Sequence, residues 1–160
     1  MGTITPEMAR VVEEQRLGFV ATIGRDGAPN LSPKGTVAVL DEDRLMFADL
    51  ASPNTVANLM ANPATEVNVV DPFRRKGFRF KGKAEVLGPE HARFAELLER
   101  FRTGPRALRD PERRVRHIVV IEVERALPLV SPAYDDGTSE AEVTERWWRH
   151  FIALRERGER

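Results

Sequence analysis

Residues 17–50 read LGFVATIGRDGAPNLSPKGTVAVLDEDRLMFADL, and this stretch decides the fold. From Leu17 to Ile23 the side chains are mostly apolar and β-forming, and a second extended run continues from about Pro29 to Leu40. The sequence GRDG at 24–27 separates the two runs and is a turn signal, because glycine and aspartate tolerate tight-turn backbone conformations. The stretch therefore predicts a β-hairpin.

Further strands are predicted outward from this hairpin. A polar turn at 41–43 precedes a third short strand at 45–48. Strands joined this tightly are antiparallel, so the first three strands are predicted in meander order. Two-residue alternation of apolar and polar side chains marks strands at 66–70 and 78–86, and an apolar run marks the last core strand at 117–123. The residues thus predict six strands, mainly antiparallel.

Two helices are indicated in the first half of the chain. Thr5 followed by Pro6 is a cap and a first helical residue, which predicts a short opening helix. Ser52 followed by Pro53 predicts a second helix of about two turns. It ends at Asn62, because the proline after it disfavours helical geometry.

Two more helices are expected in the second half. The third is opened by Pro89 and carries a core-facing stripe at helical spacing, formed by Phe94, Leu97, Leu98 and Phe101. A capping box at 139–142 begins the closing helix. Its wide apolar face consists of Val143, Trp147, Trp148, Phe151, Ile152 and Leu154. Strands in this order with few peripheral helices predict an α+β fold built on a small β-barrel.

Composition restricts the class of partner. The 25 Lys and Arg side chains balance 25 Asp and Glu, so no global positive field attracts nucleic acid or an anionic membrane. The chain has no cysteine, which excludes a disulfide framework and a thiolate nucleophile. Residues 1–10 lack an apolar signal core, and no stretch approaches the roughly 20 apolar residues of a membrane span. We expect one domain over residues 1–160, in the cytoplasm, without nucleic-acid or membrane partners.

Motifs for protein-supplied catalysis are absent from the sequence. His91, His117 and His150 show no helical metal-ligand spacing, so no metal site is predicted. There is no nucleophile elbow, phosphate-binding loop or dinucleotide fingerprint, and no residue is assigned a catalytic role. Pro33 and Gly35 lie inside an otherwise regular strand, where they weaken pairing, which indicates a place where a ligand approaches the backbone.

Several segments occur in an order that resembles a known family. They are GAPNLSPKGT at 27–36, FADLASPNT at 47–55, Asn58-Leu59, Asn62-Pro63 and the strand at 78–86 containing GKAE. In this order they resemble the pyridoxamine 5′-phosphate oxidase-like flavoproteins. The resemblance implies a six-stranded split barrel, and a homodimer that holds FMN in a cleft at its interface. It also implies that the second-strand segment lies along the isoalloxazine ring.

The same resemblance implies a set of cofactor-binding residues. They are Ser32, Pro33, Lys34, Gly35, Thr36, Ala48, Ser52, Asn54, Thr55, Arg75 and Arg79. The family's phosphate-binding Ser-Arg-Lys stretch corresponds here to Ser52, Pro53 and Asn54, so both of its cations are missing. Positive charge is therefore expected from Lys34 or from the basic residues 74–76 and Arg79, since arginine suits phosphate bidentately.

The function implied is two-electron, hydride-type transfer by bound FMN on an unknown small substrate. A deazaflavin-dependent reductase on the same fold is one alternative, and a ligand-binding or interaction module without catalysis is another. The true oxidases carry a C-terminal Arg and Trp pattern that this chain does not match. Trp147 and Trp148 point about 100° apart on a helix, so one of them is free to meet a partner subunit or cover a ligand.

Overall fold

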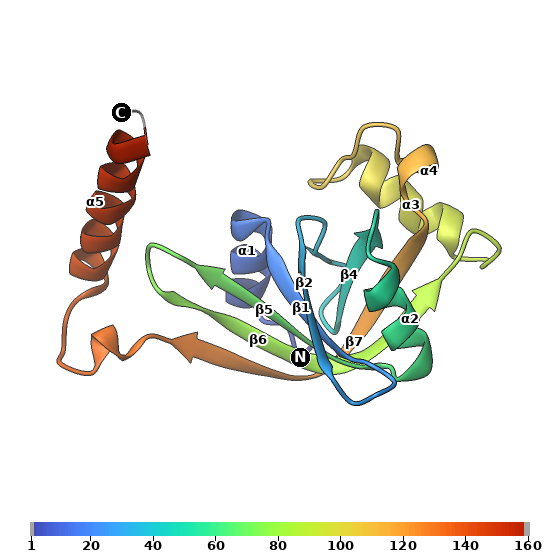
Figure 1. The fold of residues 1–160 in the computed structure, drawn as a ribbon, viewed down its shortest axis with the longest axis horizontal. Helices are drawn as coiled ribbons and strands as arrows, with labels where there is room; N and C mark the ends of the chain where they lie inside the picture. The colour runs from blue at the N-terminus through green and yellow to red at the C-terminus, as the bar shows by residue number, and fades with distance from the viewer. Residues whose placement is uncertain (1, 159–160) are drawn as a thin grey trace.

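Seven antiparallel strands curl into a half-barrel in the computed structural model, which describes residues 2–158 (Figure 1). The strands are β1 (Gly18–Ile23), β2 (Pro29–Lys34), β3 (Ala38–Val39), β4 (Arg44–Asp49), β5 (Ala64–Asp71), β6 (Lys76–Leu87) and β7 (His117–Val130). Their order across the sheet is β2-β1-β5-β6-β7-β4-β3. The predicted α+β class and the β1–β2 hairpin are confirmed, with Val20 opposite Ser32 and Thr22 opposite Asn30.

The predicted strand at 29–40 is two strands, which corrects the count from six to seven. A turn at Gly35 and Thr36 separates β2 from β3, and these two strands form opposite edges of the sheet. The two tight antiparallel turns of the predicted meander form, since β1 pairs with β2 and β3 pairs with β4. The predicted order across the sheet is wrong, because β2 and β3 lie at opposite edges and β4 pairs with β7 on its other side. Pro33 lacks an N–H and Gly35 has no side chain to pack, so the extended pairing ends there.

Helices cover the ends and one face of the sheet. They are α1 (Pro6–Gln15), α2 (Pro53–Ala61), α3 (Phe94–Thr103), α4 (Pro111–Arg114) and α5 (Glu140–Gly158), with a 3-10 turn η1 (Pro132–Tyr134). Thr5 caps α1 as predicted, since its hydroxyl accepts the N–H of Met8 at 3.3 Å. The third helix begins at Phe94 and not at Pro89, because residues 88–93 form two successive turns. No helix within residues 2–158 is long and apolar enough to span a membrane.

Two apolar clusters hold these elements together. The first fills the half-barrel beneath α1 and includes Phe47, Phe80 and Val119. The second lies between the outside of β4 and β7 and the apolar stripe of α3, and includes Met46 and Phe101. Strand β4 is thus buried on both faces, which explains why residues 45–48 are continuously apolar and do not alternate.

The closing helix α5 stands apart from the barrel (Figure 1). The predicted capping box forms: Ser139 N–H donates to Glu142 Oε2 at 2.9 Å, and the Glu142 N–H donates to Ser139 Oγ at 3.3 Å. Strand β7 runs past its predicted end at residue 123 to Val130 and carries α5 beyond the tip of the β5–β6 hairpin. Neither Trp147 nor Trp148 belongs to either apolar cluster.

Candidate functional site

A pocket of about 450 Å³ opens where the chain leaves β2 and where it leaves β4. It is lined by Ser32, Pro33, Lys34, Gly35, Thr36, Ala48, Leu50, Ala51, Ser52 and Leu108. Seven of the eleven predicted cofactor-binding residues are thereby brought together. The volume lies within the range of roughly 300 to 1,000 Å³ that is usual for small-molecule sites.

Thr36 fixes one wall of this pocket. Its hydroxyl donates to the Ala48 carbonyl at 2.9 Å and accepts the Ala48 N–H at 3.1 Å. A side chain thereby replaces the strand pairing that ends at Gly35, and both backbone groups of Ala48 stay satisfied in the interior. Gly35 and Thr36 are therefore held against β4, although β2 ends at Lys34 and these two residues belong to no strand.

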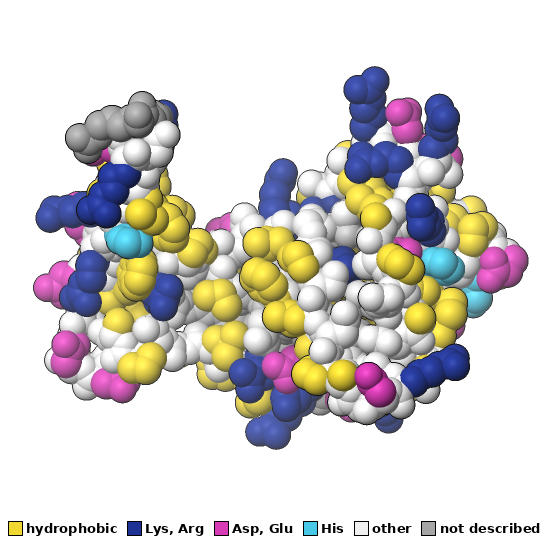
Figure 2. Space-filling view, viewed as in Figure 1, with side chains coloured by type: hydrophobic (Ala, Val, Ile, Leu, Met, Phe, Trp, Pro, Cys, Tyr) yellow, Lys and Arg dark blue, Asp and Glu magenta, His cyan; other side chains and the backbone are white. Residues whose placement is uncertain are grey.

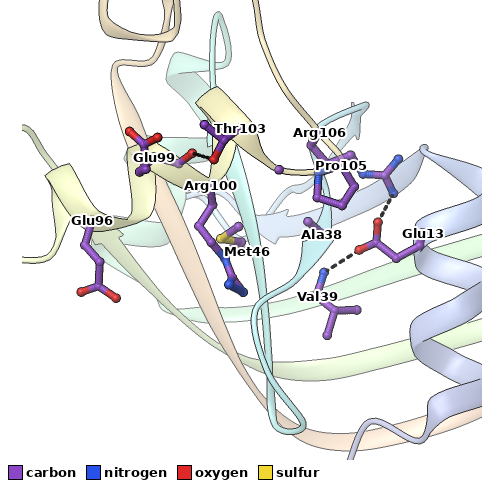
Figure 3. Close-up of a pocket in the computed structure, with 11 residues that line it drawn as sticks. Glu13, Ala38, Val39, Met46, Glu96, Glu99, Arg100, Thr103, Pro105 and Arg106 are labelled. Atoms are coloured by element: carbon purple, nitrogen blue, oxygen red, sulfur yellow. Dashed lines mark hydrogen bonds and ion pairs between the residues drawn. The ribbon is translucent and has the colours of Figure 1, made fainter.

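Arg106, on the loop between α3 and α4, fixes the same segment from behind. Its Nε donates to the Val37 carbonyl at 2.9 Å and its Nη2 to the Val12 carbonyl at 2.5 Å. Figure 3 shows Glu13 of α1 between this guanidinium, at 3.9 Å, and the N–H of Val39, at 3.3 Å. Burial lowers the pKa of Arg106, and Glu13 partly opposes that change. Arg106 thus joins segment 35–37, which connects β2 to β3, to α1.

Lys34 places an ammonium group inside the pocket wall. The residue is 7% exposed, and its Nζ donates to Ser32 Oγ and lies 5.8 Å from the centre of the Phe47 ring. Burial lowers the pKa of Lys34, while the carboxylate of Asp49 raises it in part. An ammonium has three donors. Within residues 2–158, Ser32 is the one hydrogen-bond acceptor recorded for it, so the site retains donors that suit an anionic or carbonyl oxygen.

Asp49 and His117 lie behind the pocket residue Ser52, and the sequence did not single them out for the site. Asp49 is 2% exposed, and its Oδ1 accepts both the Ser52 N–H at 2.8 Å and the Ser52 hydroxyl at 2.6 Å. Its Oδ2 lies 3.3 Å from His117 Nδ1, because Asp49 and His117 are paired across β4 and β7. The local signal was an aspartate three residues before the serine predicted to cap α2, a spacing at which a side chain commonly bonds to a nearby backbone N–H.

Ser52 therefore acts differently from the helix cap that the sequence suggested. Its side chain makes no capping hydrogen bond to α2, and its hydroxyl proton is donated to Asp49. The oxygen keeps its capacity to accept, but this donor is already used within the chain. A phosphate at this point would also face the Asp49 carboxylate.

The other four predicted residues lie outside the pocket. Asn54 is exposed on the first turn of α2, and the buried Thr55 hydroxyl accepts from Asn30 Nδ2 at 3.5 Å. Arg75 is exposed in the β5–β6 turn, with its guanidinium 4.2 Å from the centre of the Trp147 ring. Arg79 lies on β6, with Nε 2.8 Å from Glu66 Oε1. The chain does not bring either arginine to its own pocket.

Asp49 makes the site sensitive to acid. Burial alone would raise the pKa of its carboxyl, but the hydrogen bonds from Ser52 and His117 outweigh burial and hold the pKa below its ordinary value of about 3.9. A carboxyl with a depressed folded-state pKa contributes stability above its unfolded pKa, and this contribution is lost as pH falls through the folded value.

We therefore expect the melting temperature to fall as pH is lowered below about 4, with a slope that is shallower in Asp49→Asn. Thermal denaturation across that window measures it. Asp135→Asn, at an exposed carboxylate, is the control and should retain the wild-type slope. Equal slopes in wild type and Asp49→Asn would contradict this role of Asp49.

Known proteins are similar to this chain in fold and over most of its length. A family model described as "Pyridoxamine 5'-phosphate oxidase" matches residues 4–128. An uncharacterised protein of Methanocaldococcus jannaschii is 27% identical over 131 residues, which cover 80% of this chain and 82% of that protein. HupZ of Group A Streptococcus superimposes with a TM-score of 0.69 and 28% identity, covering 80% of this chain and 95% of HupZ.

An FMN-binding protein from Syntrophomonas wolfei subsp. wolfei also superimposes, with a TM-score of 0.63 over 78% of this chain and 86% of its own. It is 16% identical, so this similarity concerns the fold. The family match ends at residue 128, before η1 and α5.

Proposed function

This chain belongs to the pyridoxamine 5′-phosphate oxidase family, and from that premise we propose that it is an FMN-binding oxidoreductase acting on a small substrate. The observation that carries the proposal is the buried Lys34 ammonium in the wall of the pocket formed by segment 32–36. Bound FMN would supply two-electron chemistry, accepting hydride from a reduced donor and passing the electrons to an acceptor.

The pocket residues suit a flavin ring better than they suit its phosphate. Gly35 is exposed and lines the pocket, and a Cβ added there would meet no atom nearer than the Arg16 carbonyl at 3.8 Å, so the chain leaves open space beside its backbone. Lys34 can donate to the carbonyl and nitrogen edge of the ring, where a cation stabilises the reduced anionic form. Ala48, Leu50 and Leu108 supply apolar contacts.

The phosphate needs positive charge that this pocket does not contain beyond Lys34. We propose a homodimer with the flavin at the interface, in which Arg75 or Arg79 reaches the phosphate on the second copy. Asn54 and the first backbone N–H groups of α2 would bind the same phosphate, aided by the helix dipole. The Ser52 hydroxyl is assigned to Asp49 in this scheme and keeps the start of α2 in place.

The absorption spectrum of the purified protein tests the proposal, followed by mass identification of whatever denaturation releases. We expect a yellow protein that releases FMN and that bleaches on reduction. Release of a deazaflavin would contradict FMN as the cofactor and support the deazaflavin-dependent reductase. A colourless protein that takes up no added FMN would instead support a binding or interaction module and overturn the oxidoreductase.

Gly35→Val tests whether segment 32–36 lies along the ring. The backbone of Gly35 is not in the left-handed region and has room for a side chain, so we expect stability to change by less than about 0.5 kcal/mol. The branched side chain would occupy the open part of the pocket, so flavin affinity should fall at least about tenfold. Titration of the apoprotein with FMN measures it, with Gly35→Ala as the smaller step.

A further inference from the structure

Helix α5 carries an apolar stripe that the described part of its own chain leaves exposed. Trp148 is 52% exposed, Phe151 41%, Ile152 41% and Leu154 46%. The family model stops at residue 128, so the stripe lies outside the part of the chain that this model matches. A group of apolar side chains on a water-facing helix indicates a docking surface.

Contacts with the β5–β6 turn hold α5 away from the barrel. Glu140 accepts from Lys76 Nζ at 2.8 Å, and the Trp148 ring lies 5.3 Å from that of Phe73. Arg75 stacks on Trp147 at 4.2 Å. These contacts fix the start of the helix at the hairpin tip, and Figure 1 shows that the hairpin separates α5 from β1 and β2 of the same chain.

A second apolar surface lies on the outer face of β1 and β2. Phe19 is 40% exposed, Ile23 42% and Leu31 64%, and Leu17 beside them is 43% exposed. The pairing of Ala21 with Leu31, and of Ile23 with Pro29, places these side chains on one face of the hairpin. Figure 2 shows apolar side chains on the same side of the molecule both over the middle of the body and along α5.

We propose that α5 is an exchanged arm that docks on the outer β1–β2 face of a second copy of this chain. The proposal rests on the homodimer of the proposed function and adds which surfaces form it. When two copies related by a twofold axis exchange arms, the apolar stripe of each α5 and the outer β1–β2 face of each copy are buried together. No further copy can then be added through these surfaces, so the assembly stops at a dimer.

The sizes of the two surfaces agree with this arrangement. The 19 residues of α5 extend about 28 Å, and the six residues of β1 and of β2 extend about 20 Å, so the helix can cover the whole length of either strand. Half-exposed side chains of these types each present on the order of 80 Å². The four on α5 and the four on β1 and β2 together present about 640 Å² per partner, or about 1,280 Å² in all, which lies within the roughly 1,200 to 2,000 Å² of specific interfaces.

Charge argues against a membrane as the occupant. A helix that binds anionic lipid carries mainly lysine and arginine on its polar side. In α5 the four acidic residues Glu140, Glu142, Glu145 and Glu156 match the four arginines Arg146, Arg149, Arg155 and Arg157. Glu145 and Arg149 pair with each other at 2.6 Å.

Crosslinking tests the exchange directly, since the chain has no cysteine of its own. Leu31→Cys chains and Leu154→Cys chains carrying different tags are co-expressed and treated with a short bismaleimide. We expect a covalent product containing both tags, because each chain offers a single reactive site. Arg149→Cys on the opposite side of α5 replaces Leu154→Cys as the control and should give little product.

A second measurement follows the assembly itself. Phe151→Gln with Leu154→Gln should raise the dimer dissociation constant at least about tenfold in sedimentation. Glu145→Gln with Arg149→Gln, which alters the polar side with no change in net charge, should leave it unchanged. A dimer that gives no product with both tags overturns the exchange but not the dimer, and a monomer at micromolar concentration overturns both. The flavin content of the same samples, measured by absorption, tests the cofactor proposal separately. Binding of the whole protein to anionic vesicles, reduced by Leu154→Gln, would overturn the choice of a second copy as the partner of α5.

Discussion

Lys34→Met is expected to lower the affinity for FMN by about tenfold to a hundredfold while leaving the folded chain as stable as before or more stable. The expected loss corresponds to charge-assisted hydrogen bonds of roughly 1.5 to 3 kcal/mol. Stability should not fall, because Lys34 is 7% exposed and its ammonium has one hydrogen-bond acceptor within the described chain. Methionine fills a similar volume without a buried charge.

Fluorescence titration of the apoprotein and thermal denaturation measure the two halves of this result. The flavin retained by the variant should also have a lower reduction potential, because the cation favours the reduced anionic ring. Lys81→Met, at a half-exposed lysine paired with Glu66 on the sheet surface, is the control and should change neither quantity. An unaltered potential together with unaltered affinity would remove Lys34 from the site, even if the fold is as described.

Arg106→Met is expected to reduce the free energy of unfolding by about 2 to 4 kcal/mol. The guanidinium satisfies the carbonyls of Val12 and Val37 in the interior, and each buried carbonyl left without a partner costs roughly 1 to 3 kcal/mol. The cost is reduced because Arg106 Nη1 is itself buried and has no hydrogen-bond partner within residues 2–158, so the substitution also removes an unsatisfied donor. The net effect remains large since methionine cannot donate to either carbonyl.

Urea denaturation at neutral pH checks this value. The matched control is Arg100→Met, since Arg100 also donates to a carbonyl, that of Leu40 at 2.8 Å, but is exposed. Its loss should cost less than about 1 kcal/mol. Flavin affinity should fall with Arg106→Met as well, because Val37 directly follows the pocket residue Thr36. A stability change no greater than that of Arg100→Met would show that other contacts hold segment 35–37 between β2 and β3.

Local patterns were sufficient for most elements and for their caps. The GRDG turn predicted the β1–β2 hairpin, Thr5 and Pro6 predicted the start of α1, and the capping box at 139–142 predicted α5. In each case the decisive contacts lie within a few residues of one another, where turn and capping preferences act directly. The misjudged strand depends on a distant contact as well as on Pro33 and Gly35: after the break at Lys34, Thr36 bonds to Ala48, 12 residues away, and this directs the chain to the opposite edge of the sheet.

The apolar run at 45–48 shows the limit of periodicity. A continuous apolar strand indicates burial on both faces but does not say which strands it pairs with. Its pairing with β7 brings Asp49 opposite His117, 68 residues later, and a slip of one residue would turn Asp49 to the other face. The family resemblance named Ser52 but not its partner Asp49. A residue-by-residue comparison does not show which hydroxyl groups already donate a hydrogen bond within the chain.

The sequence by itself determined that the chain forms an antiparallel barrel with amphipathic helices, and it predicted segment 32–36 as the place for a ligand. These conclusions depend on side-chain periodicity, turn chemistry and motif order, which act over short distances. Only the tertiary structure decided that Lys34 is buried, that Asp49 takes the Ser52 proton, that Arg75 and Arg79 lie away from the pocket of their own chain, and that α5 leaves its apolar face exposed. Each of these depends on strand register and on contacts between segments far apart in sequence, and the free energy of such contacts is set by what the whole fold places opposite each side chain.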